Sequence, residues 1–251
     1  MMQRGFIVFL LWSLVSISHA ETMIGKLQWA EKTQLNAAVS GRIEKISVKA
    51  GELIKQGGLL LTIEQQLYQA RLLQAKAHML AQEQAAAEVE REMNNAAELF
   101  ERTVISEHEF VLAKNAHALA QAQMRQAQAS LIAAQNNQIQ SQLHAPFDAW
   151  VLKILAKENQ VVDLQHQLWP LVEIARAGYM QVEVHLNPQQ RSQIKIGQSV
   201  KVKVSNKNYN AFVDQAELSA SGQGDERLFR VSAIFQTDKL LLPGQSAELS
   251  F

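Results

Sequence analysis

Histidine and methionine are the residues of this chain whose side chains favour soft or borderline transition-metal ions. The chain has 7 histidines, 7 methionines and no cysteine, so thiolate ligands, a thiolate nucleophile and disulfides are all excluded. Thioether sulfur favours Cu(I), but Met79, Met93 and Met124 fall in a helical apolar pattern, where methionine usually fills a core. No pair of histidines has the H-x-x-x-H spacing of helical metal sites. We therefore expect no metal site; the histidines stand at 19, 78, 108, 117, 144, 166 and 185.

Patterns for other chemistry are equally weak in the sequence. No Ser/His/Asp signature stands out, and the stretch Gly222-Gln223-Gly224 lacks the third glycine and the preceding strand of a dinucleotide site. The 24 basic and 24 acidic residues balance, so no net field attracts nucleic acid. We predict that the protein is not an enzyme, carries no cofactor and does not bind nucleic acid.

The first 20 residues have the pattern of an export signal. Arg4 supplies a positive charge, an apolar segment of about 12 residues follows, and Ser18-His19-Ala20 forms a small-x-small cleavage site. A membrane-spanning helix needs about 20 apolar residues. We predict a cleaved signal peptide at residues 1–20, with an uncleaved membrane anchor as the alternative.

A long helical segment occupies the middle of the chain. Residues 65–142 contain neither proline nor glycine and are rich in Ala, Gln, Glu and Leu, the composition of long helices. Apolar residues recur every seven positions, which is typical of the seams of a coiled coil. We predict an antiparallel coiled-coil α-hairpin over residues 66–142; its rows are Leu72, Met79, Ala86, Met93 and Phe100 with Ala75, Val89 and Ala96, and Phe110, Met124 and Leu131 with Ala113, Ala120, Ala127 and Ala134.

The turn of this hairpin can be placed from capping signals. Ser106 and Glu109 form an S-x-x-E capping box, and Ile105 and Phe110 have the spacing of a hydrophobic staple, so a helix should begin at Ser106. The preceding helix should then end between Arg102 and Val104. Folding the chain there places Phe100 opposite Phe110.

Two segments on either side of the helices resemble each other. AAVSGRIEKISVKAGELI begins at Ala37, APFDAWVLKILAKENQVV begins at Ala145, and in the alignment Gly51 falls on Asn159. Glycine and asparagine are the residues that best tolerate a left-handed turn conformation. Each copy is too small to bury a core alone, so we predict that residues 37–65 and 143–176 pair into one β-sandwich.

The remaining segments alternate between apolar and polar residues, as half-buried strands do. Val182 and Val184 belong to one such run and Val200 and Val202 to another, and turn signals separate the runs, among them Pro243-Gly244. We predict a β-barrel over residues 177–251, completed by an N-terminal strand within residues 21–36.

This order of segments resembles one protein family. AAVSGRIEKISVKAGELIKQGGLLLTIE, the helical hairpin, LHAPFDAWVLKI and the strands YMQVEVHL, IKIGQSVKVKV and LLPGQSAELSF are similar to HlyD-type membrane fusion proteins, in particular the periplasmic adaptor subunits of resistance-nodulation-division (RND) efflux pumps. The resemblance implies an elongated, multi-domain protein of mixed α and β class. A long antiparallel coiled-coil α-hairpin is inserted in a lipoyl-like β-sandwich, and an adaptor β-barrel follows. We expect no separate membrane-proximal domain. A carrier lysine is not expected, because the helices replace the turn that holds it in lipoyl domains.

The function that the resemblance implies is assembly. The protein would link an inner-membrane RND transporter to a TolC-like outer-membrane channel, form a hexameric ring with itself, and work in the periplasm of a Gram-negative bacterium, associated with the inner membrane through its pump partner, in the export of small molecules. Many such adaptors carry Arg, then Leu four residues on, then Ser seven further on, at the hairpin tip. Leu99 and Ser106 match, whereas Asn95 stands in the Arg position. The expected channel-docking residues are Asn95, Leu99, Arg102, Thr103, Val104, Ile105 and Ser106.

Three alternatives remain open at the level of the sequence. The partner could be an ABC-type exporter. The protein could be a periplasmic coiled-coil scaffold or holdase, which would expose an apolar tip. A metal-binding efflux accessory would need Met or His pairs on one exposed strand.

Overall fold

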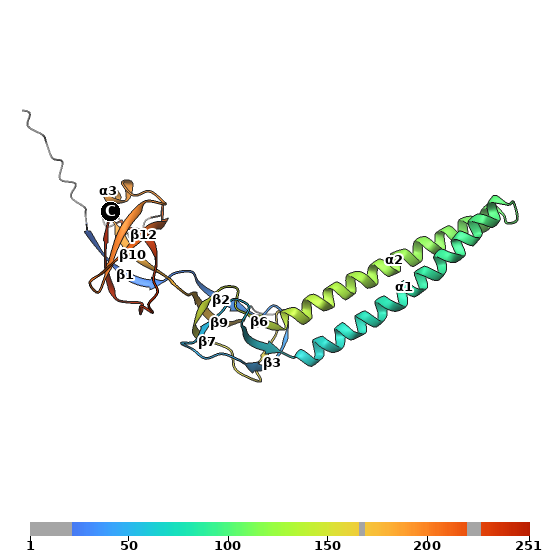
Figure 1. The fold of residues 1–251 in the computed structure, drawn as a ribbon, viewed down its shortest axis with the longest axis horizontal. Helices are drawn as coiled ribbons and strands as arrows, with labels where there is room; N and C mark the ends of the chain where they lie inside the picture. Colours follow the sequence, from blue (N-terminus) through green and yellow to red (C-terminus); the bar gives the residue numbers. More distant parts are fainter. Residues whose placement is uncertain (1–21, 166–168, 220–226) are drawn as a thin grey trace, which may run out of the picture. The chain divides into compact units, whose positions relative to one another are not determined.

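The computed structural model describes residues 22–165, 169–219 and 227–251, and Figure 1 shows its fold. The predicted signal peptide at residues 1–20, and the glycine-containing stretch at 222–224, lie outside the described residues. The chain divides into two compact units. Of the described residues, those from 22 to 30 and from 178 onward form one unit, and those between 31 and 177 form the other.

The first unit is a closed antiparallel β-barrel. Alternate side chains point inward and form one core, in which Leu27, Val182, Val202 and Leu249 are fully buried. A short helix, α3 (Pro188–Ser192), follows the strand that ends at Leu186, and Asn187 is its N-cap. Asn187-Pro188 therefore begins a helix. In barrel order the strands are β1 (Thr22–Trp29), β10 (Tyr179–Leu186), β13 (Phe229–Gln236), β12 (Lys207–Ala216), β11 (Ser199–Val204) and β14 (Ser246–Ser250).

The second unit contains two 4-stranded sheets that share one buried core, to which Ile43, Leu61, Val151 and Ile174 contribute. Each repeated segment supplies strands to both sheets. The sheet orders are β2 (Lys32–Asn36), β9 (Pro170–Arg176), β7 (Ala149–Ile154), β4 (Leu53–Ile54), and β6 (Gln142–His144), β5 (Leu59–Ile63), β3 (Gly41–Ile46), β8 (Val161–Val162).

The two repeated segments exchange equivalent hydrogen bonds. The backbone N–H of Gly51 donates to the carbonyl of Val151, and that of Asn159 donates to the carbonyl of Ile43, each over 2.8 Å. Gly51 (φ 84°) and Asn159 (φ 65°) both have left-handed backbone conformations. The predicted pairing of the two segments into one sandwich is therefore observed, with the two predicted turn residues at equivalent positions.

One predicted boundary is wrong. We expected residues 21–36 to belong to the barrel, but only β1 does. β2 pairs with β9 in the other unit, from Lys32 opposite Ala175 to Leu35 opposite Val172. The cause is a change of partner after Ala30: Leu35 packs against the sandwich core, and Lys32 pairs with the buried carboxylate of Glu173 at 2.9 Å.

Two long helices interrupt the sandwich between β5 and β6. α1 (Gln65–Glu101) and α2 (Glu107–Gln140) lie side by side and antiparallel (Figure 1). The less exposed positions of both helices include the predicted heptad rows except Phe100, which is 37% exposed, and Ala86, Ala120 and Ala127 are buried. At the base of α1, Tyr68 is buried and its hydroxyl donates to the carbonyl of Ser40 at 2.6 Å. Within the described ranges, neither helix is apolar enough over sufficient length to cross a membrane.

Candidate functional site

The turn between α1 and α2 begins with a Schellman motif. The backbone N–H of Val104 donates to the carbonyl of Leu99, and that of Thr103 to the carbonyl of Phe100, each at 2.9 Å. These bonds satisfy carbonyls that the end of a helix leaves without a partner. Helix α1 ends at Glu101 with Arg102 as its C-cap, one residue before the predicted range of Arg102 to Val104.

Thr103 holds the position of this motif that usually belongs to glycine. Its φ is 58°, in the left-handed region. A β-branched residue is rare there because its Cβ crowds the following carbonyl, at a cost of about 1–2 kcal/mol. The turn therefore carries local backbone strain at an exposed position.

The start of α2 is a complete capping box. The Ser106 hydroxyl accepts from the backbone N–H of Glu109 at 3.3 Å, and the Glu109 carboxylate accepts from the backbone N–H of Ser106 at 2.8 Å. The hydrogen bond from this backbone N–H, followed by one from the Ser106 hydroxyl, lowers the pKa of Glu109. The predicted helix start is thus confirmed.

An aromatic pair joins the two helices next to the turn. The rings of Phe100 and Phe110 stack with their centroids 5.1 Å apart and their planes at 11°. This confirms that Phe100 lies opposite Phe110. Ile105 is half-buried, at the spacing of a staple to Phe110.

The other predicted residues of the turn face solvent. Val104 is 65% exposed and Leu99 40%, and Asn95, Arg102 and Thr103 are exposed as well. Asn95, Leu99 and Arg102 follow each other at spacings of four and three, so they share one face of the last turns of α1. The structure therefore brings the seven predicted residues together in one exposed region. That region offers apolar contact area with polar groups around it, which suits binding to another protein. Docking itself stays a prediction.

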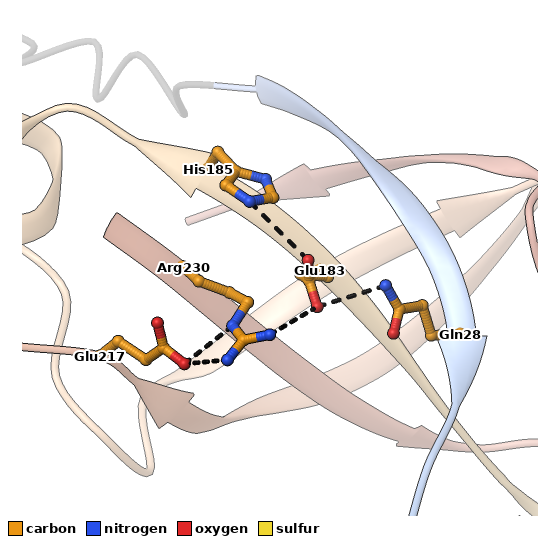
Figure 2. A network of polar contacts seen from close by, with 5 residues as sticks. All are labelled: Gln28, Glu183, His185, Glu217 and Arg230. Carbon is orange, nitrogen blue, oxygen red and sulfur yellow. Dashed lines mark hydrogen bonds and ion pairs between the residues drawn. The ribbon is translucent and has the colours of Figure 1, made fainter. Parts of the chain in front are cut away.

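The barrel contains a polar cluster that the sequence analysis missed (Figure 2). The Gln28 amide donates to the Glu183 carboxylate at 3.2 Å, and this carboxylate also lies 3.9 Å from Arg230 and 3.8 Å from His185. Arg230 donates to Glu217, whose hydrogen bonds and charge raise the pKa of Arg230. These residues come from β1, β10 and β13 and from just after β12, so no local motif announces them. The only available signal was the alternation in β10, which places Glu183 and His185 on the outer face.

The described residues include no group of three or more His, Asp or Glu side chains placed to hold a metal ion. The carboxylates of the polar cluster are instead bonded to an amide and a guanidinium. The cluster is thus an ion-pair network on the barrel surface.

A β-sandwich interrupted by a helix pair and followed by a barrel is the architecture of membrane fusion proteins, and a family model confirms the class. The model described as "RND MFP, barrel-sandwich hybrid domain" matches residues 31–172, more than half of the chain. The chain belongs to the membrane fusion protein family, whose members are adaptors and not enzymes.

Individual relatives agree with this assignment. The chain is 30% identical over 152 residues to the uncharacterized protein YdhJ of Escherichia coli K12, covering 61% of this chain and 53% of YdhJ. It is 25% identical over 225 residues to the nodulation protein NolF of Rhizobium meliloti, covering 88% of this chain and 60% of NolF. The chain therefore spans 53% to 60% of the length of these curated relatives.

A solved structure has the same fold. A MacA-MexA chimera that contains the α-hairpin domain of Pseudomonas aeruginosa MexA superposes with a TM-score of 0.66 at 20% identity, covering 92% of this chain and 78% of the chimera. At this identity the likeness concerns the fold.

Proposed function

We propose that this protein is a periplasmic adaptor that links an inner-membrane RND-type transporter to a TolC-like outer-membrane channel in a complex that exports small molecules. Membership of the membrane fusion protein family supports the adaptor role. The observation that carries the rest is the exposed turn: Val104, Leu99 and Arg102 are presented to solvent between two helices of about 50–55 Å, at 1.5 Å per residue.

The helix pair acts as an antiparallel coiled coil that holds the docking residues away from the sandwich. The burial of Ala120 and Ala127 supports this assignment, because alanine at every second seam position of α2 lets two helix axes approach closely. In this assignment α1 and α2 form the hairpin, β2 to β9 form the lipoyl-like sandwich, and β1 with β10 to β14 forms the barrel.

The turn docks on the periplasmic end of the channel. Leu99 and Val104 supply apolar contacts, and Arg102 and Thr103 supply polar ones. Asn95 replaces the arginine that many adaptors of this type carry, so the nearby Arg102 provides the positive charge in our proposal. Ser106 caps α2 and, with Ile105, fixes the direction in which the turn leaves the helix.

Copies of the chain assemble into a hexameric ring, with helix pairs side by side. Gln123, Gln126 and Gln128 are exposed on α2 and support such an assembly, because amide groups gain hydrogen bonds without burying charge. Native mass spectrometry of the purified chain tests this: a hexamer is expected, and a strict monomer at micromolar concentration contradicts ring formation by the chain alone.

The partner transporter is of the RND type in our proposal, because the matching family model is described for RND membrane fusion proteins. An ABC-type exporter is the alternative. The protein is placed in the periplasm of a Gram-negative bacterium, held at the inner membrane by the transporter.

In-cell photo-crosslinking tests the proposal. Probes replace Arg102 and Thr103 in the turn, Phe212 on the exposed barrel surface, and Glu83, exposed in the middle of α1, as a control. Mass spectrometry identifies each adduct. We expect an outer-membrane channel from the turn, an RND transporter from Phe212 and no channel from Glu83.

Each other result has a defined meaning. An ABC exporter captured at Phe212 replaces the RND partner. A transporter at Phe212 without a channel at the turn contradicts docking but keeps the adaptor role. Unrelated unfolded proteins at the turn, without either partner, favour a scaffold or holdase.

A further inference from the structure

The polar cluster of the barrel borders a cavity that the proposed adaptor function does not use. The cavity measures about 140 Å³, and β1, β10, β12 and β13, with the residue just after β12, contribute its lining. Cavities of about 150 Å³ hold a molecule the size of benzene. Any ligand would therefore be small. The lining residues are Gln28, Gln181, Glu183, Gln215, Glu217, Arg230 and Ser232.

Ser232 has an unsatisfied hydroxyl in this lining. Its side chain is 4% exposed, and its Oγ is the buried side-chain polar atom without a hydrogen-bond partner among the described residues. A buried polar group without a partner costs about 1–3 kcal/mol, so such a group in a native protein requires an explanation, for example a bound water or ion. The hydroxyl therefore points to an occupant.

Glu183 lies directly opposite Ser232 in the pairing of β10 with β13. Its side chain is only 16% exposed, yet the carboxylate accepts one close hydrogen bond, from Gln28, while Arg230 and His185 lie 3.8–3.9 Å away. A carboxylate has about four acceptor positions. Both residues therefore line the same cavity.

The charge of the lining favours a cation. Glu183 and Glu217 outweigh Arg230, which Glu217 already engages through two donor atoms. Lys26 is opposite Glu183 in the strand register but does not line the cavity. An anion would face two carboxylates. A metal ion would need more carboxylate or imidazole ligands than this part of the described chain brings together.

We propose that this cavity binds a small organic cation with N–H donors, such as an alkylammonium or a guanidinium group. The ligand would donate one hydrogen bond to the Ser232 hydroxyl and at least one to the Glu183 carboxylate. This site lies in the barrel unit, so its test is independent of the proposed docking of the interhelical turn.

The test is a titration of the ¹⁵N-labelled full chain with ethylammonium chloride, followed by NMR. Tetramethylammonium chloride is the matched probe, because it has the same charge but no N–H donor. Small ligands gain limited free energy per atom, so we expect a Kd on the order of 1–10 mM. Saturable shifts should appear at the amides of 181–183 and 230–232 with ethylammonium only.

Three variants locate the binding. Glu183→Gln should weaken ethylammonium binding about tenfold or more, and Ser232→Ala about threefold, because both remove an acceptor. Glu248→Gln is the control, since Glu248 is an exposed carboxylate of the same barrel that pairs with Lys203 at 3.2 Å; it should leave binding unchanged. Thermal unfolding of each variant verifies the fold.

Three results overturn the proposal. Equal shifts with tetramethylammonium would reduce the effect to ionic strength. Equal weakening by Glu248→Gln would make it a general surface effect. The lack of saturable shifts up to about 100 mM ethylammonium, well above the expected Kd, would leave the cavity to water alone.

Discussion

Gly51 and Asn159 in the sandwich have a left-handed backbone conformation, and so does Thr103 between the two long helices. In the sandwich each such residue also donates a backbone hydrogen bond across to the other repeated segment. In the interhelical turn a β-branched residue has the same conformation at an exposed site. At Gly51 and Asn159 the residue type thus matches the backbone conformation, whereas at Thr103 it does not. Strain retained at an exposed site supports a role in binding.

The largest expected effect is on the free energy of unfolding, and it should differ between the buried sandwich core and the exposed turn. Ile43 is fully buried in the sandwich core, so Ile43→Ala should lower the free energy of unfolding by about 2–5 kcal/mol. Leu99→Ala removes a side chain in the turn that is 40% exposed, so it should change the free energy of unfolding by less than about 0.5 kcal/mol. Urea unfolding followed by circular dichroism measures both. Equal losses of unfolding free energy in the two variants would contradict this difference and show that Leu99 contributes as much to stability as Ile43.

The second prediction exchanges the residue types of the two turns. A side chain at position 51 would meet no atom within 4 Å, so Gly51→Thr should cost about 1–2 kcal/mol through backbone conformation alone. Thr103→Gly should relieve that strain and stabilise the turn by about 0.5–1 kcal/mol, since the greater freedom of glycine in the unfolded chain offsets part of the gain.

Amide hydrogen exchange measures the local stability of the turn in these variants. The amides of residues 98–110 should exchange about threefold more slowly in Thr103→Gly. Asn159→Gly is the control, because asparagine already tolerates its conformation, and its effect should stay within a few tenths of a kcal/mol. Faster exchange in Thr103→Gly would mean that the threonine side chain stabilises the turn.

These differences also explain what the sequence could predict. The start of α2 and the Phe100–Phe110 pair were predictable because caps, staples and heptads are local patterns, and the end of α1 was predicted to within one residue. Gly51 and Asn159 were found because the chain repeats itself. The strain at Thr103 could not be predicted from the sequence, since only the backbone conformation shows which residue of the turn has a positive φ.

Long-range pairing was harder to predict. β2 has a single apolar residue, Leu35, and its partner β9 lies far along the chain. The barrel cluster joins Gln28, Glu183 and Arg230, whose strands are brought together only by barrel closure. In both cases the tertiary fold decides the neighbours, and periodicity carries no information on them.

The third prediction separates the two roles of Ser106. Ser106→Ala removes the N-cap of α2 and should destabilise the helix start by about 1 kcal/mol, whereas Ser106→Asp keeps a capping oxygen and should preserve it. Both variants lack the hydroxyl. Hydrogen exchange at residues 107–110 reports the cap, and the yield of the Arg102 photo-crosslink reports docking. Crosslinking that is lost in Ser106→Ala and kept in Ser106→Asp assigns the residue to capping alone; loss in both shows that the hydroxyl contacts the partner.

The smallest expected effect compares a carboxylate from each region. Glu173 is buried in the sandwich and its pKa is lowered, first by its hydrogen bond with Lys32; the pKa of exposed Glu109 is lowered by Ser106. Because both pKa values lie below the ordinary 4.5, each contribution to stability is present above that value and is lost as the pH falls through the folded pKa. NMR titration of the two carboxyl groups should therefore give midpoints below 4.5.

Crossed variants make this comparison specific. Lys32→Met should raise the midpoint of Glu173 and leave that of Glu109 unchanged, because the two carboxylates share no partner in the structure. Ser106→Ala should raise the midpoint of Glu109 by a smaller amount and leave that of Glu173 unchanged, because alanine removes the hydroxyl donor but keeps the backbone N–H that is the main cause of the lowered pKa. The two variants should also differ in what acid does to the rest of the molecule. Protonation of Glu173 removes a charge that joins β2 to β9, so it weakens the sandwich core, whereas protonation of Glu109 loosens only the first turn of α2. A shift of both midpoints by either variant would show that the turn and the sandwich are energetically coupled along α1 and α2.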